Sequence, residues 1–395
     1  MNQASDTQER TVPMEGELSL LAHSAIEEVR GDLNERLHRL HRDLRSQPQF
    51  DAVDRIAIAI HEPATDLLRT FAQSSDVQSP LSHYAATLSN VPSLKRLVDT
   101  RRLRVIDDLA GAEGTTTRHS SAIAQSGYRS SVTLPMFNEG EFYGFVFFNS
   151  RRVGFFRDER FRQLLPYAGL VTLLGVSTLR NARIFRGAAR TALAFSAVRD
   201  DETAEHQHRV AHFSRIIAGE LAEAHRLSDE YIEMLVQFAP LHDIGKVGVP
   251  DAILRKPGRL TVEEYLAIKT HVGIGCRMVD TMMQELGLHG LKNAEILRNV
   301  VAAHHEAWDG SGYPLGLKGD RIPLEGRILA VADVFDALTS KRPYKDPWSN
   351  DAAVAYLQQK AGSQFDPECV QALLQCLPRV LEIQHRYPQP CTQPA

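Results

Sequence analysis

The chain has 395 residues, of which 43% are hydrophobic and 24% are charged, and its formal net charge is −4. Single domains usually hold about 100 to 200 residues, so this length predicts two domains and a connector. The balance of apolar and charged residues argues against a disordered chain, a collagen-like chain and a disulfide scaffold. The small negative charge provides no attraction to polymeric nucleic acid or to an anionic membrane.

The sequence also predicts a cytoplasmic protein without a membrane segment. Residues 1–17 lack the basic and apolar regions of a secretory signal. The longest nearly apolar stretch, 164–176, is shorter than the roughly 20 residues that span a bilayer. The cysteines form no CxxC pair, which is typical of a reducing compartment, and they are Cys276, Cys369, Cys376 and Cys391.

Residues 19–180 are predicted to form an α/β domain on an antiparallel sheet, after a disordered segment at 1–18. Helical apolar spacing over 19–45 is followed by a β-rich run at 53–60. Two further β-rich runs, 130–135 and 142–149, flank a polar, glycine-containing turn and predict a hairpin.

Within this domain, residues 127–174 resemble a GAF domain, a small-ligand sensor fold. No cysteine precedes Cys276, which excludes a bilin bound covalently to a cysteine of this domain. The Asn-Lys dipeptide of GAF domains that bind cyclic nucleotides does not occur in the chain. The resemblance therefore leaves two alternatives, a sensor for an unknown small ligand and a ligand-free dimerisation module.

A long helical connector is predicted to follow, with residues 181–198 as the connecting helix proper. Apolar residues recur at three- and four-residue steps along it, and they are Leu164, Leu165, Ala168, Val171, Leu174, Val176, Leu179, Ala182 and Phe185. Such a stripe must be covered either by its own domains or by the same helix of a second chain. We expect the second arrangement, a homodimer in which the helix pair links the two domains.

Residues 199–384 are predicted to form a helical bundle, and residues 385–395 a loose tail. Periodic apolar residues recur near 210–221, 232–241 and 294–303. Ligand-type side chains accompany these helices. Glu202 and His206 share one helix face, although such a pair is more often a solvated contact. The other ligand-type residues are His242, Asp243, His271, His304, His305 and Asp333, with Asp336 placed to orient a ligand histidine.

These motifs in this order resemble the HD-GYP family, bacterial phosphodiesterases of the HD superfamily that cleave cyclic di-GMP. The resemblance covers about 197–378 and includes the segments LHDIGK, HHEAWDGSGYPLG and SKRPYK. It implies an all-α HD bundle that holds two or three divalent ions, iron or manganese. The implied metal ligands are Glu202, His206, His242, Asp243, His271, His304, His305 and Asp333. Two positions depart from the usual pattern, Ala204 and Ala307.

The resemblance further implies hydrolysis of cyclic di-GMP to pGpG and onward to GMP, regulated by the GAF-like domain. Asp243 and Lys246 are the implied catalytic residues, and Arg342, Lys345 and Tyr313 the implied substrate residues. Clustered cations suit this chemistry because they activate water and neutralise phosphoryl charge. The GYP loop is also an expected contact for partners of the diguanylate cyclase type. The alternative is a non-catalytic HD-GYP module that binds the dinucleotide or a protein.

Overall fold

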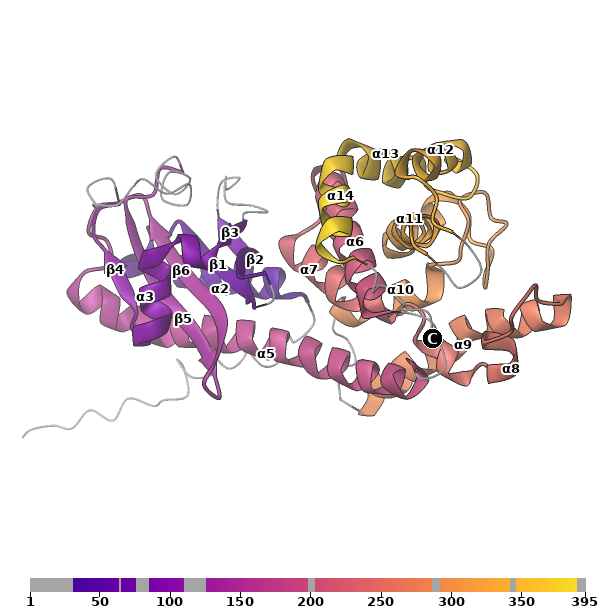
Figure 1. Ribbon diagram of the computed structural model, residues 1–395. Helices are drawn as coiled ribbons and strands as arrows, with labels where there is room; N and C mark the ends of the chain where they lie inside the picture. The colour runs from indigo at the N-terminus through magenta and orange to yellow at the C-terminus, as the bar shows by residue number, and fades with distance from the viewer. Residues whose placement is uncertain are drawn as a thin grey trace, which may run out of the picture.

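The computed structural model describes residues 31–63, 65–75, 85–109, 126–197, 203–285, 292–341 and 346–388. A region built on a β-sheet precedes a helical region, and helix α5 (Asp158–Ala197) runs beneath both (Figure 1). The predicted segments 1–18 and 389–395 lie outside the described residues, so their expected disorder stays a prediction. Among the described residues, no helix is long and apolar enough to cross a membrane.

The sheet is antiparallel and has six strands in the order β3-β2-β1-β6-β5-β4. Its strands are β1 (Arg55–Glu62), β2 (Leu67–Ser75), β3 (Ala85–Thr87), β4 (Arg104–Ile106), β5 (Ser130–Asn138) and β6 (Glu141–Ser150). The predicted hairpin is confirmed. Glu139 and Gly140 connect β5 to β6, and both have positive φ, as the tight turns that match strand twist require.

Helices cover both faces of the sheet. Ile56 and Ile58 pack with residues of α2 (Leu33–Arg45) and α5. Ala57 and Ala59 pack in a second cluster with residues of α3 (Pro92–Thr100). Strand β1 is therefore buried along most of its length, which explains why its sequence lacks a strict alternation of apolar and polar residues.

Helix α5 is one continuous helix of 40 residues. Part of its predicted apolar stripe is covered by the same chain, because Leu164, Ala168 and Val171 are buried in the core beneath the sheet, whereas Leu165 is 38% exposed. The expectation that Val171 forms a seam between two chains is therefore wrong. The boundary expected between 180 and 181 falls inside this helix, and the side chains of Phe185 and of 192–197 lie outside the described part.

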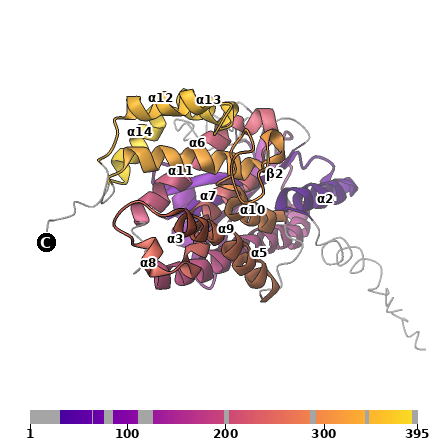
Figure 2. The ribbon, with the colours of Figure 1, turned by 90° about the vertical axis from the view of Figure 1, so that its right-hand side faces the viewer.

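The second region is a helical bundle, as predicted. Its helices are α6 (Ala204–His225), α7 (Asp229–Phe238), α8 (Asp251–Leu254), α9 (Val262–Glu285), α10 (Lys292–Ala303), α11 (Leu324–Thr339), α12 (Asn350–Lys360), α13 (Pro367–Gln375) and α14 (Leu377–Arg386). Figure 2 shows α12, α13 and α14 grouped over α6 and α11. The rings of Phe213 on α6 and Phe335 on α11 meet edge to face in the core.

Short 3-10 segments complete the fold. They are η2 (Pro48–Phe50), η3 (Leu88–Asn90), η4 (Ala239–Leu241), η5 (Ile244–Gly248) and η6 (Gly319–Arg321). Segments η4 and η5 enclose His242 and Asp243, so these two side chains lie in a turn between helical pieces. Helix α6 begins after Thr203, whose hydroxyl accepts a hydrogen bond from the His206 backbone N–H and caps the helix.

Candidate metal centre

Seven ligand-type side chains converge in two adjoining groups in the helical region. In each group, one ligand atom per residue lies within 4.8 Å of the others. The first group contains Asp243, His271, His304 and His305, and the second contains His206, His242 and Asp333. The two groups meet at neighbouring residues of the η4–η5 turn, because His242 belongs to one and Asp243 to the other.

A glycine in the turn brings α9 close to Asp243. A Cβ atom on Gly245 would lie 1.9 Å from the His271 carbonyl oxygen and 2.4 Å from the Gly275 nitrogen. Only a residue without a side chain permits this approach. As a result, the His271 Nε2 atom lies 3.0 Å from an Asp243 carboxylate oxygen.

Backbone carbonyls orient three of the imidazole rings. The Nδ1 atom of His242 lies 2.9 Å from the Ala239 oxygen, and that of His271 lies 2.8 Å from the Ile268 oxygen. The His304 Nδ1 atom lies 3.0 Å from the Val301 oxygen. Because a carbonyl only accepts, each Nδ1 atom carries a proton, and a ring with that single proton presents the lone pair of Nε2.

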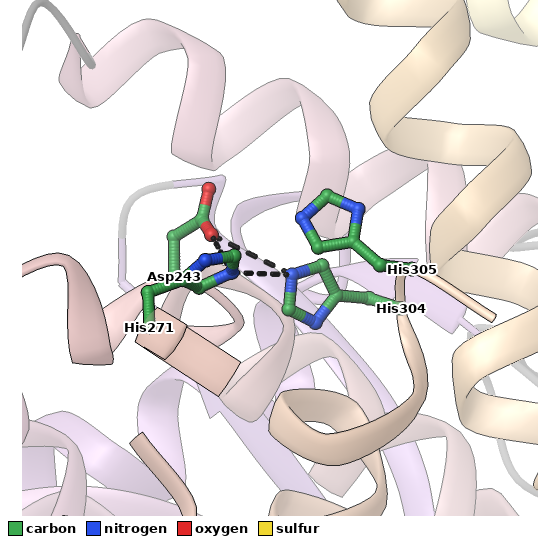
Figure 3. Close-up of side chains that lie close together, drawn as sticks. All are labelled: Asp243, His271, His304 and His305. Atoms are coloured by element: carbon green, nitrogen blue, oxygen red, sulfur yellow. Dashed lines mark hydrogen bonds and ion pairs between the residues drawn. The ribbon is translucent and has the colours of Figure 1, made fainter. Parts of the chain in front are cut away.

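These lone pairs face other acceptors. The Nε2 atoms of His271 and His304 lie 3.4 Å apart, and that of His304 lies 3.5 Å from an Asp243 oxygen. Figure 3 shows the two rings turned toward each other beside the Asp243 carboxylate. Acceptors that converge without a proton between them repel one another, and a bound cation removes that repulsion. The donor set of imidazole nitrogens and carboxylate oxygens therefore fits divalent transition metals.

The electrostatics of the site favour an ionised carboxylate and neutral rings. Burial alone would raise the pKa of Asp243, but the nearby Lys246 ammonium and the His242 ring hold it well below its ordinary value. The Lys246 Nζ atom lies 2.8 Å from that carboxylate. Burial lowers the pKa of His304, and burial together with His304 lowers that of His305 to about 2. Metal ligation requires these protonation states.

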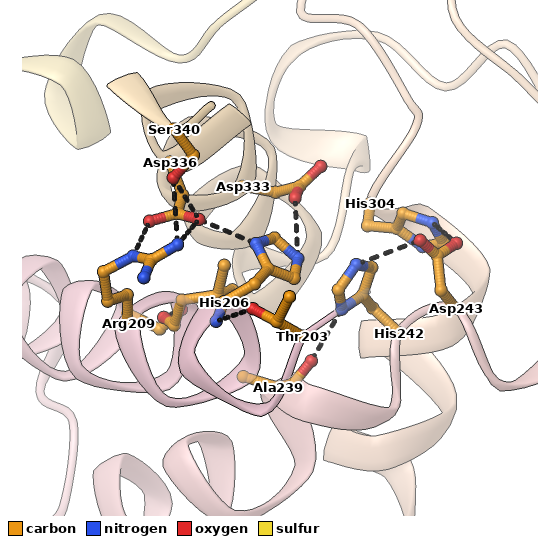
Figure 4. A network of polar contacts seen from close by, with 12 residues as sticks. Thr203, His206, Arg209, Ala239, His242, Asp243, His304, Asp333, Asp336 and Ser340 are labelled. Carbon is orange, nitrogen blue, oxygen red and sulfur yellow. Dashed lines mark hydrogen bonds and ion pairs between the residues drawn. The ribbon is translucent and has the colours of Figure 1, made fainter. Parts of the chain in front are cut away.

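A second carboxylate holds His206 in place. The His206 Nδ1 atom lies 2.7 Å from an Asp336 oxygen, so the Nδ1 proton is donated there and Nε2 faces Asp333 at 3.6 Å (Figure 4). Arg209 donates from Nε and Nη2 to both Asp336 oxygens, at 2.5 and 2.9 Å. Burial would raise the pKa of Asp336, but the bonds from His206 and Arg209 hold it below its ordinary value. This arrangement fixes the tautomer and the direction of a ligating histidine.

The GYP loop (308–316) closes over His305. The Glu306 carboxylate accepts backbone N–H groups of Leu315 and Leu317 at 2.8 and 2.9 Å. A Cβ atom on Gly312 would lie 2.2 Å from the Ala307 nitrogen, so the loop folds back only because this residue is glycine. The Tyr313 ring then stacks on His305 with 4.7 Å between centroids.

Lys269 lies between two aromatic rings at the edge of the site. Its Nζ atom is 4.6 Å from the ring centroids of both Tyr265 and Tyr313. Tyr265 is 49% exposed, so one side of this cation–π pair is open to a ligand.

The structure places many of the residues predicted from sequence. Among the eight predicted ligands, the seven named above converge, whereas Glu202 lies outside the described residues. Lys246 lies beside Asp243 and Tyr313 beside His305, whereas Arg342 and Lys345 also lie outside the described residues. Sequence reasoning missed Arg209 and Lys269. Arg209 follows His206 by three residues on the same helix, a spacing that would have indicated it, but nothing in the sequence marks Lys269 as a neighbour of Tyr313.

Comparison with known proteins identifies the helical half. A family model for the HD domain matches residues 197–369. The helical region therefore contains an HD domain. The cyclic di-GMP phosphodiesterase response regulator RpfG of Xanthomonas campestris is 48% identical over 178 residues, which are 45% of this chain and 44% of that protein.

Other relatives of the HD domain are named after two different substrates, cyclic di-GMP and 3′3′-cGAMP. A cyclic di-GMP phosphodiesterase of Thermotoga maritima is 41% identical over 194 residues, which are 48% of this chain and 49% of that protein. The 3′3′-cGAMP-specific phosphodiesterase 2 of Vibrio cholerae is 41% identical over 177 residues, 45% of this chain and 32% of that protein. The chain spans less than half the length of each relative named here.

Solved structures similar to the sheet region include GAF domains. A GAF domain/HD domain protein from Geobacter sulfurreducens is 16% identical with a TM-score of 0.29, over 37% of this chain and 92% of that one. The phycocyanobilin-bound GAF domain of a cyanobacterial phytochrome is also 16% identical, with a TM-score of 0.30, over 38% of this chain and 88% of that one.

Proposed function

We propose that the chain is a metal-dependent phosphodiesterase that hydrolyses cyclic di-GMP to pGpG, and pGpG onward to GMP. The observation that carries this proposal is the convergence of imidazole nitrogens on the Asp243 carboxylate, because a divalent metal ion suits that set of donors. The names of the relatives that share the HD domain support cyclic di-GMP as the substrate.

The proposed cofactors are two or three iron or manganese ions. They are held by His206, His242, Asp243, His271, His304, His305 and Asp333, with Glu202 as the further ligand. When bound, such ions activate the attacking water and neutralise charge on the phosphoryl oxygens. Oxygen and nitrogen donors without a thiolate suit these metals.

The residues of the chain supply orientation and charge. Lys246 is proposed as a catalytic residue, because its ammonium lies beside Asp243 and can donate to a phosphoryl oxygen. Arg342, Lys345 and Tyr313 are proposed to hold the substrate, and Lys269 joins them as a further cation at the open edge of the site. A cation between two aromatic rings can bind a phosphate while the exposed ring stacks on a base.

Regulation and assembly are proposed on the same basis. The sheet region and the HD domain share helix α5, the ion pair between Arg215 and Glu62, and hydrogen bonds from Asn34 to Glu230, which supports control of hydrolysis by a ligand of the GAF-like region. We retain a homodimer in this proposal, with the exposed side chains of α5 as the contact. We also retain the GYP loop as a contact for partners of the diguanylate cyclase type. The proposed location is the cytoplasm, where the free thiols of Cys276, Cys369 and Cys376 would stay reduced.

One experiment tests the function. The chain is purified anaerobically, its metals are measured by mass spectrometry, and the products from cyclic di-GMP and from 3′3′-cGAMP are identified by chromatography. We expect iron or manganese and release of pGpG and GMP. Tight binding of the dinucleotide without product formation would identify the chain as a non-catalytic receptor instead. Preferential cleavage of 3′3′-cGAMP would make 3′3′-cGAMP, and not cyclic di-GMP, the substrate.

A further inference from the structure

The face of the sheet that carries helix α3 divides into an apolar half and a largely polar half. Ala59 and Phe145 on the sheet pack with Leu94 of α3 in one apolar cluster (Figure 1). Side chains two residues apart along a strand point to the same face, so this face can be followed toward the other end of the strands. There it carries two cross-strand rows, Arg104, Thr133, Phe147, Ala57 and Gln73 in the first, and Ile106, Ser131, Asn149, Arg55 and Ser75 in the second.

The polar half is buried, although its two rows contain two guanidinium groups and no carboxylate. Arg55, Thr133 and Asn149 are 4%, 1% and 3% exposed. Arg55 donates from Nε to Gln73 Oε1 at 3.2 Å and from Nη1 to Asn149 Oδ1 at 3.1 Å. Both acceptors are neutral amides, so these bonds leave the charge of the buried guanidinium without a counterion.

Burial disfavours the charge of both guanidinium groups. It is the largest effect on Arg55, where it lowers the pKa to about 10 against the opposing effects of Tyr128 and Asp229. Burial also lowers the pKa of Arg104. In the part of the chain that the structure describes, neither guanidinium forms an ion pair with a carboxylate. An anion bound beside them would compensate this charge.

Two buried polar atoms on this face are left without partners. Arg104 on β4 and Thr133 on β5 are paired across the two strands. Among the described residues, neither Arg104 Nε nor Thr133 Oγ1 has a hydrogen-bond partner. A buried donor without an acceptor costs stability, so a ligand that accepts from both atoms is favoured. Phe147 follows Thr133 in the same row and supplies an aromatic surface for the body of such a ligand.

A series of hydrogen bonds connects this face to the HD domain. Arg55 holds the side chain of Gln73, and the Gln73 backbone N–H donates to Asn34 Oδ1 at 3.0 Å. The backbone N–H and Nδ2 of Asn34 donate to Glu230 Oε2 at 3.0 and 3.3 Å. Glu230 lies in the first turn of α7, and α7 leads through η4 to His242. A movement of Arg55 can therefore reach the turn that carries a candidate metal ligand.

We propose that the polar half of this face binds a small organic anion through Arg104, Thr133 and Arg55, and that the bound anion changes the metal affinity of the candidate centre. The first part stands on the sheet face alone. The second part rests on the proposed function, because it names the class of ligand by which the GAF-like region would control the HD domain. The charged group is a carboxylate or a phosphate, since both accept hydrogen bonds from a guanidinium and a hydroxyl.

Calorimetry on the full chain tests the first part with three probes that share a phenyl ring, which are benzoate, phenyl phosphate and the neutral benzamide. We expect one or both anions to bind at least about tenfold more tightly than benzamide, and the tighter anion identifies the charged group. Arg104→Gln should weaken this binding about tenfold, which separates the sheet face from an anion site at the metals. Arg162→Gln is the matched control, because Arg162 is exposed on α5, which packs on the other face. No preference for an anion, or parental affinity in Arg104→Gln, overturns the site.

Thr133→Val separates binding from a structural role. The substitution removes a hydroxyl that has no partner among the described residues, so the ligand-free variant should unfold at the same urea concentration as the parent or at a higher one. Its affinity for the preferred anion should fall several-fold. Lower stability with unchanged affinity would show that Thr133 does not bind the anion and would overturn its assignment.

Titration with Mn²⁺, with and without the preferred anion, tests the second part. We expect the Mn²⁺ affinity to change by at least about fivefold, the lower end of typical coupling between two sites. Asn34→Ala should bind the anion as the parent does but lose this change, and Arg104→Gln should lose both. Equal Mn²⁺ affinity with and without the anion overturns the coupling. Neither titration requires turnover, so inactivity toward cyclic di-GMP would refute the proposed function and leave these results unaffected.

Discussion

The Nε2 atoms of His271 and His304 lie 3.4 Å apart, and each ring donates its Nδ1 proton to a backbone carbonyl. When each ring carries only its Nδ1 proton, the two Nε2 lone pairs face each other. The pair is therefore arranged for a shared cation, and the first prediction follows from it.

His304→Gln should remove at least one metal ion and nearly all hydrolysis. The amide takes the place of an imidazole ligand in the group that contains Asp243, His271 and His305. Asp243→Ala should have a larger effect, since its carboxylate contacts both groups. Elemental analysis of the purified variants measures the loss. His225→Gln is the control, because His225 contacts only Glu368 among the ion pairs of the structure's described part. Full metal content in Asp243→Ala would contradict the proposed centre.

The second prediction concerns Asp336, which contacts His206 but belongs to neither group. Asp336→Asn keeps the shape of the side chain and removes the charge, so His206 loses the partner that fixes its Nδ1 proton. Loss of such a partner typically lowers metal affinity about 10- to 100-fold. Mn²⁺ titration should show this weakening at one ion while the ions near Asp243 stay bound. If the Mn²⁺ affinities of Asp336→Asn equal those of the parent protein, Asp336 supports Arg209 only and does not contribute to metal binding by His206.

The sequence predicted the main features of both regions because their periodicities are strong. The β-rich runs at 130–135 and 142–149 and the intervening Glu139 and Gly140 were enough to predict the hairpin β5–β6. The set of ligands was predicted from the order of the motifs, which resembles the HD-GYP family, while the four-residue spacing of Glu202 and His206 and the apolar surroundings of Asp333 marked single positions.

The sequence could not predict which surface covers helix α5. The apolar stripe through Val171 is equally compatible with a sheet of the same chain and with a second helix, and the structure shows the sheet. It also could not predict the stacked contact between the rings of Tyr387 and His212, because these residues are separated by most of the HD domain along the chain. Contacts of this kind depend on tertiary packing that no local pattern records.

The third prediction concerns substrate recognition at Lys269. Lys269→Met keeps much of the side chain's volume and removes the cation between Tyr265 and Tyr313. We expect the Michaelis constant for cyclic di-GMP to rise about tenfold with unchanged metal content, the pattern of a lost substrate contact. Hydrolysis of bis-p-nitrophenyl phosphate, which lacks a second phosphate and a base, should be unaffected. An equal loss with both substrates would assign Lys269 a structural role.

The fourth prediction concerns the homodimer. Among the side chains of α5 that the structure describes, the large apolar ones that remain exposed are Leu165, Leu173 and Ile184, and they fall within about 100° of one another around the helix. Leu173→Glu should produce monomers in light scattering and change the free energy of unfolding by less than about 0.5 kcal/mol. Val171→Glu buries a charge and should destabilise the chain by about 3 kcal/mol or more. If light scattering shows that the parent protein is a monomer, α5 is not a contact between two chains.

The last prediction concerns pH and His212, which is buried between the sheet region and the HD domain. Burial and then the Arg215 cation lower the pKa of His212 to about 4, from 6.5. Between these values the unfolded chain binds a proton at this position and the folded chain does not, so the free energy of unfolding falls as the pH drops from 6.5 toward 4. Above about pH 7 the ring is neutral in both states and contributes no slope.

Urea unfolding of the metal-free chain at a series of pH values measures this effect. His212→Gln should flatten the slope by up to one proton, about 1.4 kcal/mol per pH unit, because the amide keeps a polar group beside Tyr387 but does not titrate. Tyr387→Phe is the matched control, since it removes the hydroxyl that lies 3.2 Å from His212 Nε2 and leaves the imidazole in place. The control should retain the slope. An identical slope in His212→Gln and the parent would show that His212 is protonated equally in the folded and unfolded chains.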